Sequence, residues 1–449
     1  MYLYISLQER KQRKPILKSV IDMVTDRISC LPDHVIDHIL SYLPIREAVR
    51  TSVLSKIWRN NWHTLPNLVF DNEYKGTSNV VNESTIVKIV DHVLLVHSGP
   101  INLFKLSNEE SLPEIDMDRW ILHLTRRSIK ELALVVWIND ARYKIPWCLF
   151  TCQSLCHLKL KWCVLKPPKM FEGFRNLKSL ELEALTVAQD DFENLISGCP
   201  LLEILRLIGI DGLTQINIHA PNLRVFEISD EFDGEFDGIS LDNTFQLSTV
   251  VVDSWWDVMS ESHESTLRGR PSNLLKIFDN RPHIQNLVIG SCFLKYFAAG
   301  DLPVKLPTPC ADLSYLSLTI HLDDLKEIST ALCLLRSSPN LQKLKIFVEI
   351  ELHNVPLRPL TDSYSWEDVF SRPATPIQVR HVTIDSISGF QLELDFIKFL
   401  LLYSPVLEKI IVKPLEIVGA EFLIELARFK RASREAEIIY MVPKRVGRS

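Results

Sequence analysis

An apolar triplet with fixed spacing recurs along most of the chain and constrains the fold more than any other feature. One apolar residue is followed three positions later by a second, and two positions after that by a third, as in Leu177-Leu180-Leu182. Twelve such triplets lie between Ile101 and Val412, and their starts are 21 to 38 residues apart. A repeat of this period is typical of a solenoid, in which stacked units share one core.

The spacing within each triplet identifies the secondary structure. The last two apolar positions are two residues apart, which would place them about 200° apart around a helix. On a strand the same two positions lie on one side. Each triplet therefore predicts a short strand with one buried face.

The segments between triplets predict helical crossovers. Prolines stand two residues ahead of five triplets, at Pro200, Pro221, Pro282, Pro339 and Pro405. Proline ends a helix and favours extended chain before it, so each proline marks a return to the sheet. Apolar residues at helical spacing precede each of them except Pro221. Strands joined by such crossovers predict an α/β leucine-rich-repeat solenoid with a parallel sheet and irregular curvature.

Polar residues alternate with the buried positions and are expected on the concave face of the sheet. Their charges are mixed, and each one alone is most simply a solvated side chain. A long polar sheet face is nevertheless a common protein-binding surface. The candidate substrate contacts are His157, Lys159, Glu181, Arg206, Glu227, Tyr315, Lys343 and Lys345.

The segment LPDHVIDHILSYLP, residues 31–44, predicts an amphipathic helix near the N-terminus. With Leu31 at 0° on a helical wheel, its other apolar residues fall between about 20° and 180°. These residues are Tyr42, Val35, Ile39, Leu43, Ile36 and Leu40. Two more short helices are expected, one from Ile45 to Val53 and one lined by Leu54, Trp58, Trp62 and Leu65. Packing against two short helices would bury only part of this apolar arc. The first repeat or a partner protein should cover the remainder.

These residues carry a resemblance to a known family. DRISCLPDHVIDHILSYLPIREAVRTSVLSKIWRNNWHTLPNLVFD, residues 26–71, resembles the F-box of plant F-box proteins. CLFTCQSLCHLKL, GFRNLKSLEL and LISGCPLLEILRL resemble the leucine-rich repeats of the same proteins, and residues 379–412 resemble their FBD region. The chain is thus similar to the plant F-box/FBD/leucine-rich-repeat family.

The resemblance implies a role and a set of contacts. In this family the F-box docks onto a Skp-type adaptor, which links it to a cullin ubiquitin ligase, while the repeats hold a protein substrate. The adaptor contacts implied here are Leu31, Pro32, Ile36, Ile39, Leu40, Leu43, Pro44, Val53, Leu54 and Trp58. Many relatives have lysine or arginine where this chain has Ile57, which weakens any claim about that position.

The expected domain organisation follows from these segments. Residues 1–24 form a basic leader, 25–70 the F-box, 71–360 the leucine-rich repeats and 361–449 an FBD-like region that continues the solenoid. The basic cluster of the leader is either a nuclear-import signal or a solvated tail.

The remaining features argue against other functions. A net charge of −6 does not favour nucleic-acid binding. The sequence contains no run of eighteen apolar residues, so we expect no membrane-spanning helix. Phosphate-loop and hydrolase motifs are absent, so we expect no enzyme and no cofactor. Cys148, Cys152, Cys156 and Cys163 lack a C-x-x-C spacing, so we expect no metal site. Reduced cysteines favour the nucleus or the cytoplasm. The main alternative function is a non-ligase scaffold or receptor whose N-terminal helices cap the repeats.

Overall fold

The computed structural model describes residues 31–43, 45–54, 58–59, 61–70, 83–137, 142–230, 238–254, 278, 283–349 and 376–442. The contacts divide the chain into two compact units, Met1–Trp162 and Cys163–Ser449. The division falls within the region predicted as repeats, and the predicted domain boundaries stay predictions.

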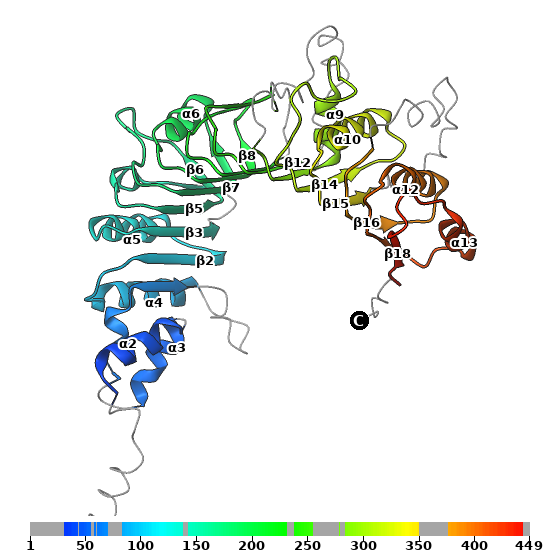
Figure 1. The fold of residues 1–449 in the computed structure, drawn as a ribbon. Coiled ribbons are helices and arrows are strands. Elements are labelled where there is room, and N and C mark those ends of the chain that lie inside the picture. The colour runs from blue at the N-terminus through cyan, green and yellow to red at the C-terminus, as the bar shows by residue number, and fades with distance from the viewer. Residues whose placement is uncertain are drawn as a thin grey trace, which may run out of the picture. The chain divides into compact units, whose positions relative to one another are not determined.

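Unit 1 begins with short helices and continues as a parallel sheet (Figure 1). Its elements are α2 (Asp33–Ser41), α3 (Ile45–Arg50), η1 (Thr51–Val53), η2 (Asn61–Thr64), β1 (Asn67–Phe70), α4 (Glu83–Val96), β2 (Leu103–Ser111), α5 (Glu114–Arg126), β3 (Glu131–Trp137), β4 (Tyr143–Lys144), η4 (Trp147–Thr151) and β5 (His157–Lys161). Strands β1, β2, β3 and β5 pair in this order, each parallel to the next. Helices α4 and α5 connect successive strands and lie side by side.

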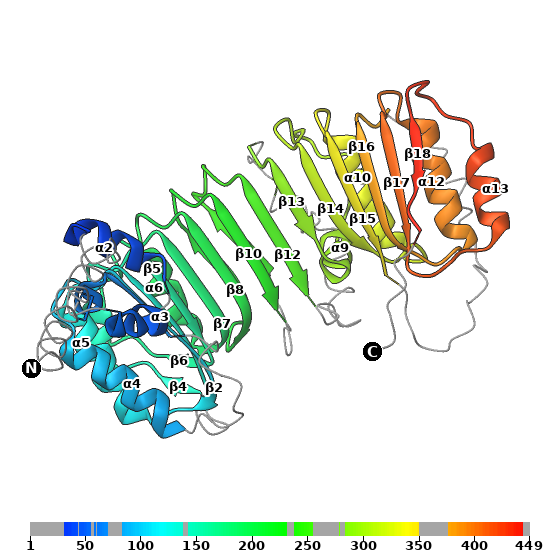
Figure 2. The ribbon, with the colours of Figure 1, turned by 90° about the horizontal axis from the view of Figure 1, so that it is seen from below.

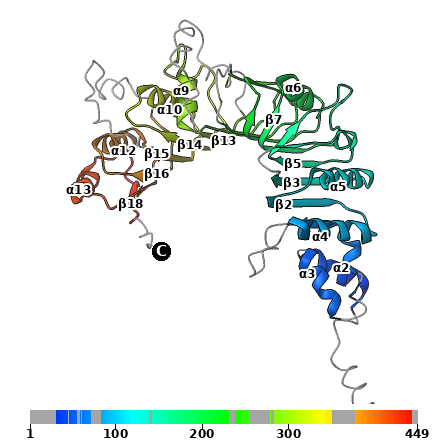
Figure 3. The same cartoon turned by 180° about the vertical axis from the view of Figure 1, so that it is seen from behind.

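Unit 2 repeats the same arrangement over a longer sheet, whose strands lie side by side in Figure 2. Figure 3 shows the elements of Figure 1 from behind. Its first half contains β6 (Cys163–Leu165), β7 (Ser179–Val187), α6 (Gln189–Ser197), β8 (Ile204–Asp211), β9 (Gln215–His219), β10 (Val225–Asp230), β11 (Gly238–Asp242) and β12 (Thr249–Ser254). Its second half contains β13 (Asn286–Ile289), α9 (Ser291–Ala298), β14 (Tyr315–Ile320), α10 (Leu325–Ser337), β15 (Lys343–Val348), β16 (His381–Ile387), α12 (Gln391–Tyr403), β17 (Lys409–Pro414), α13 (Ala420–Arg428) and β18 (Glu437–Tyr440).

The main sheet of unit 2 is parallel and follows chain order. Its path is β7-β8-β10-β12-β13-β14-β15-β16-β17-β18, and β9 and β11 form a separate parallel pair. Helices α6, α9, α10 and α12 lie along one face of the main sheet (Figure 1). A strand, a crossover and a parallel strand repeated in this way form the predicted leucine-rich-repeat solenoid, so the fold class is confirmed.

The apolar triplets form the core, as their spacing predicts. All three residues of every triplet are buried, and none is more than 2% exposed. Burial alternates along the strands, as in β15, where Lys343 is exposed and Leu344 is buried. Removing this alternating apolar face from water supplies the main stabilisation of the repeats.

The predicted crossovers are mostly confirmed. Helices α6, α10 and α12 precede Pro200, Pro339 and Pro405 as expected. The segment before Pro221 contains strand β9, and Pro282 with its expected helix lies outside the described residues. Helix α9 follows β13 directly, in a crossover for which the sequence suggested no helix.

Two buried glutamates join strand and helix at equivalent corners of unit 2. Glu327 is the third residue of α10 and Glu393 the third residue of α12, and both are at most 1% exposed. Glu327 accepts a hydrogen bond of 2.8 Å from the backbone N–H of His321. Glu393 accepts from three successive backbone N–H groups, which we discuss below. A carboxylate near a helix N-terminus pairs with N–H groups that have no intrahelical acceptor.

The pair of His321 and Glu327 makes one of these corners sensitive to pH. His321 Nδ1 lies 3.1 Å from Glu327 Oε1, while Lys295 Nζ lies 3.5 Å from the same carboxylate and Glu349 lies 3.8 Å from His321 Nε2. The hydrogen bond to Glu327 raises the pKa of His321 above its ordinary value of 6.5. Burial raises the pKa of Glu327.

We therefore expect the thermal stability of unit 2 to fall as the pH rises through the folded pKa of His321. Because that pKa is higher in the folded than in the unfolded state, the stabilisation is complete below about 6.5 and is lost above the folded value. The raised pKa of Glu327 acts in the same direction at lower pH. Thermal unfolding between pH 5.5 and 9 should show a larger decline in wild type than in His321→Gln. Equal declines would contradict the role of this imidazole.

Gly173 and Gly198 allow a close approach of two backbones in unit 2. Gly173 precedes β7 and has a φ of +94°, and Gly198 follows the last residue of α6. A Cβ atom on Gly173 would lie 1.9 Å from the carbonyl oxygen of Gly198. The contact therefore requires glycine at this turn.

Candidate partner-binding surfaces

The helical part of unit 1 has a small apolar core. Ile36 and Leu40 of α2 are completely buried, and η2 packs against this helix. The other buried apolar residues of this part are Ile45, Ala48, Trp58, Trp62 and Leu65. A core of this size gives the four short helical segments only marginal stability.

Large apolar side chains remain exposed on the same segments. Ile39, Tyr42 and Leu43, at the end of α2, are 39%, 75% and 37% exposed. Val53 and Leu54, at the end of η1, are 85% and 63% exposed. Only part of the apolar arc of α2 is therefore buried inside the helical part, as the helical wheel predicts. Exposed apolar side chains gathered on one small unit are typical of an interaction site.

The residues predicted as adaptor contacts divide between these two groups. Leu31 is half-buried and Pro32 is exposed, and Ile39, Leu43, Val53 and Leu54 are also accessible. Ile36, Leu40 and Trp58 lie in the core, and Pro44 lies outside the described residues, as does Ile57. Which of these residues touch a partner stays a prediction.

Two details of the helical part differ from the sequence interpretation. Leu54 was expected to share one face with Trp58, Trp62 and Leu65, but it is exposed whereas those three are buried. Leu54 is the C-cap residue of η1, whereas Trp62 belongs to a separate helical segment, η2. Tyr42 lies inside the apolar arc of the helical wheel and is exposed, although it is not among the predicted adaptor contacts.

The second candidate surface is the polar face of the sheet in unit 2. Pairing places polar residues of neighbouring strands in rows that cross the sheet. One row contains Tyr315, Lys343, His381, Lys409 and Glu437. A second row contains Glu181, Arg206 and Glu227, and farther along it Ser317, Lys345 and Thr383.

Three of the predicted substrate contacts are bound to one another. Arg206 Nη1 lies 2.7 Å from Glu181 Oε1, and Arg206 Nε lies 2.9 Å from Glu227 Oε2. The three side chains are 27–36% exposed, so water screens the ion pairs and each adds little stability. We call Glu181, Arg206 and Glu227 the ladder. Because Arg206 pairs with both glutamates, the ladder has no unpaired positive charge and a small net negative charge.

The other predicted substrate contacts lie apart from the ladder. His157 and Lys159 belong to β5 of unit 1, where His157 is exposed and Lys159 half-buried. In unit 2, Tyr315 and Lys343 are adjacent across β14 and β15. Lys345 places its Nζ 4.1 Å from the centre of the Phe347 ring. Substrate contact by any of these residues stays a prediction.

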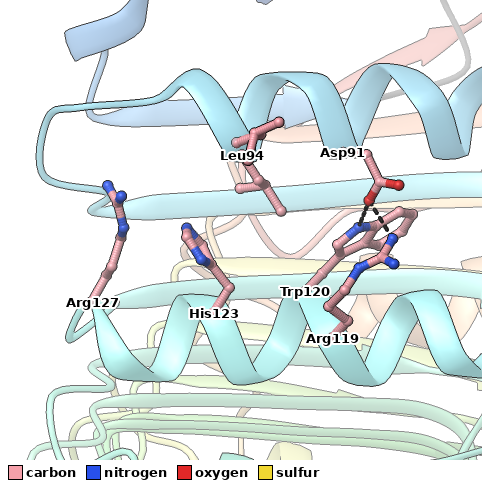
Figure 4. Close-up of a pocket in the computed structure, with 7 residues that line it drawn as sticks. Asp91, Leu94, Arg119, Trp120, His123 and Arg127 are labelled. Atoms are coloured by element: carbon pink, nitrogen blue, oxygen red, sulfur yellow. Dashed lines mark hydrogen bonds and ion pairs between the residues drawn. The ribbon is translucent and has the colours of Figure 1, made fainter.

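A cavity of about 340 Å³ lies between α4 and α5 of unit 1 (Figure 4). Asp91 accepts hydrogen bonds from Trp120 Nε1 at 2.7 Å and from Arg119 at 2.5 Å. Burial and the nearby Arg127 and His97 lower the pKa of His123, and its buried Nε2 has no hydrogen-bond partner among the described residues. The described lining residues include no serine, threonine or cysteine that this imidazole could activate as a nucleophile.

The arrangement of the cysteines and acidic residues in the described ranges bears on two kinds of chemistry, metal binding and thiol reactivity. Among the described residues, no group of three or more histidine, cysteine or acidic side chains is arranged to hold a metal ion. Burial raises the pKa of Cys199 to about 11 and that of Cys310 to about 12, so neither thiol ionises readily. None of the helices within the described ranges is long and apolar enough to span a membrane.

Two family models match this chain. Residues 28–70 match the model described as F-box domain. Residues 117–346 match the model described as FBD-associated F-box protein At5g56370, LRR repeats. The first match covers the helical part of unit 1 with β1, and the second extends from α5 to β15.

Two relatives from Arabidopsis thaliana cover almost the whole chain, and a third covers about half of it. F-box/FBD/LRR-repeat protein At1g13570 is 38% identical over 425 residues, 93% of this chain and 98% of the relative. FBD-associated F-box protein At5g56370 is 27% identical over 448 residues, 92% of this chain and all of the relative. F-box/FBD/LRR-repeat protein At4g00160 is 33% identical over 227 residues, 49% of each chain.

Proposed function

The chain belongs to the F-box/FBD/LRR-repeat protein family, and we propose that it is the substrate-recognition subunit of a Skp–cullin–F-box ubiquitin ligase. In this proposal the F-box docks a Skp-type adaptor and, through it, a cullin. The polar face of the repeats holds a protein substrate. The chain has no catalytic step of its own, because ubiquitin transfer belongs to the other subunits.

The strongest support is the exposed apolar surface of the F-box. Tyr42, Val53 and Leu54 are each more than 60% exposed, although burying a side chain of this size is worth about 1.5–3 kcal/mol. A partner that covers them recovers this free energy. We propose that Leu31, Pro32, Ile39 and Leu43 extend the same contact surface.

The buried members of the predicted set support this surface from inside. Ile36 and Leu40 are the completely buried residues of α2, which packs against η2, and Trp58 is buried as well. Substituting these three would disturb the fold of the F-box together with docking. Exposed positions therefore provide the cleaner test.

We expect the double substitution Val53→Glu with Leu54→Glu to weaken adaptor binding about 100-fold. Each change replaces an exposed apolar contact with a charge, and truncating a central contact alone typically costs about 2 kcal/mol or more. The measurement is the Kd between the full-length chain and a purified plant Skp-type adaptor by biolayer interferometry. Because both residues are exposed, circular dichroism should show unchanged folding.

A matched control is available in unit 2. Val304 and Leu415 are 54% and 62% exposed, so Val304→Glu with Leu415→Glu makes the same chemical change away from the F-box. This control should bind the adaptor within twofold of wild type. Equal binding by both double variants would reject the proposed surface. A wild-type chain that binds no adaptor would favour the alternative, a repeat scaffold whose N-terminal helices are a structural cap.

A further inference from the structure

Three side chains that carry or can carry positive charge line up across adjacent strands in unit 2. The pairing places Lys343 of β15 beside His381 of β16, and His381 beside Lys409 of β17. Each is followed by a buried core residue, so all three lie on the face of the sheet opposite the core. We call Lys343, His381 and Lys409 the basic row. Figure 2 shows the three strands side by side.

The described acidic side chains near the basic row pair with Arg380, His381 and Lys413, and not with the two lysines of the row. Glu408 lies 2.5 Å from Arg380 Nη1 and 3.4 Å from His381 Nε2, and Asp385 pairs with Lys413 at 3.2 Å. Lys343 and Lys409 make no ion pair with any residue that the structure describes, although Glu437 is next to Lys409 in register.

The basic row differs in this respect from the ladder of Glu181, Arg206 and Glu227. In the ladder, charges of opposite sign alternate across the strands and neutralise one another. In the basic row, Lys343, His381 and Lys409 stand on adjacent strands whose backbones are about 4.8 Å apart, and the charges of the two lysines repel one another without neutralisation by an ion pair. An anionic partner would relieve this repulsion. The ladder gains less from such a partner, because its charges already pair with one another.

We propose that the basic row binds an extended acidic segment of the substrate protein, with side-chain carboxylates as the anions. This inference rests on the proposed function, in which the sheet face holds the substrate. Lys343 and Lys409 are two strand spacings apart, about 10 Å. An extended peptide that crosses the strands presents alternate side chains about 6.7 Å apart, so two or three alternating carboxylates span the row.

The neighbours of the basic row set the edges of this site. Tyr315 continues the row on β14 and offers an aromatic surface without charge. Lys345, on the same side of β15 as Lys343, adds a further cation beside the Phe347 ring. Glu437 on β18 disfavours acidic residues beyond Lys409. The acidic segment is therefore short, about four to six residues.

The test uses a fluorescein-labelled peptide, Ser-Glu-Ser-Glu-Ser-Glu-Ser, and its counterpart with glutamine in place of glutamate. Binding to the full-length chain is followed by fluorescence anisotropy at 50 and 300 mM NaCl. We expect wild type to bind the glutamate peptide at least tenfold more tightly than the glutamine peptide at low salt. Salt should reduce this preference, because it screens exposed charges.

Lys343→Glu with Lys409→Glu should reduce binding of the glutamate peptide at least tenfold. The control is Lys305→Glu with Lys398→Glu, which makes the same change in net charge at exposed lysines outside the row. The control should bind within twofold of wild type. Equal losses in the two variants, or equal binding of the two peptides by wild type, would overturn the inference.

The same variants separate this inference from the proposed function. Lys343→Glu with Lys409→Glu should bind the Skp-type adaptor as wild type does, because both substitutions lie outside the F-box. If adaptor binding holds while the peptide preference is absent, the basic row is not an acidic-segment site and the proposed function stands. If the peptide preference holds while wild type binds no adaptor, the proposed function fails and the site remains.

Discussion

Replacing Glu393 with alanine is expected to destabilise the last repeats of unit 2 by about 2 to 4 kcal/mol. Glu393 Oε2 accepts hydrogen bonds from the backbone N–H groups of Gly389 at 2.7 Å and Phe390 at 2.8 Å. Its Oε1 accepts from the N–H of Ser388 at 2.9 Å. Alanine removes a buried acceptor that serves three donors at the corner between β16 and α12, and it leaves a void beside them.

Hydrogen exchange of the full-length chain is the suitable measurement, because repeat proteins can lose stability locally. Faster exchange is expected in α12, β17 and β18, with little change in β7 and β8. Glu393→Gln retains one acceptor oxygen and should lose less. Glu421→Ala is the matched control, since Glu421 is an exposed residue in the first turn of α13. Unchanged exchange in α12 of Glu393→Ala would show that water replaces the carboxylate without loss.

Replacing Gly173 with alanine is expected to cost about 2 to 5 kcal/mol. An L-residue is strained at the φ of +94° found here, and the new methyl group would overlap the carbonyl of Gly198. Both atoms in this clash belong to the backbone or are fixed to it, so no side-chain rotation relieves it. The end of α6 must therefore move away from the turn that leads into β7.

Thermal unfolding and hydrogen exchange of α6 and β7 measure this effect. Gly419→Ala is the control, because a Cβ atom on Gly419 meets nothing within 4 Å. Its stability should remain within about 1 kcal/mol of wild type, since alanine is a weaker N-cap than glycine but reduces the freedom of the unfolded chain. A Gly173→Ala variant as stable as this control would mean that the turn accepts another conformation.

The sequence determines the strands of this fold more clearly than the connections between them. Triplets such as Leu177-Leu180-Leu182 encode burial directly, because alternation on a strand separates inside from outside. Strand β9 was missed although Ile216 and Ile218 alternate with polar residues and are buried. Strand β9 begins four residues after the end of β8, where the sequence predicts a connection. An exposed connection can show the same alternation of apolar and polar residues.

The candidate sites were predictable only in part. Within the apolar arc of α2, the sequence does not tell that Ile36 faces inward and Ile39 outward, because this depends on how η2 packs against the helix. The ladder was more accessible to prediction. Glu181, Arg206 and Glu227 all stand between the second and third apolar residues of their triplets, so equal register places them side by side. Their ion pairs then depend on rotamers that the sequence does not specify.

The order of strands in unit 2 has a consequence for how the chain acquires its structure. The strands of the path β7-β8-β10-β12-β13-β14-β15-β16-β17-β18 pair in chain order, and among the described strands only β9 and β11 lie between paired strands along the chain. Bringing two partners together closes a loop of only tens of residues, and the entropy lost in closing a loop grows slowly with its length. Folding can therefore start at one repeat, and each following repeat can pack onto it as the chain leaves the ribosome. A growing chain of this kind needs no distant segment before its first repeats become stable.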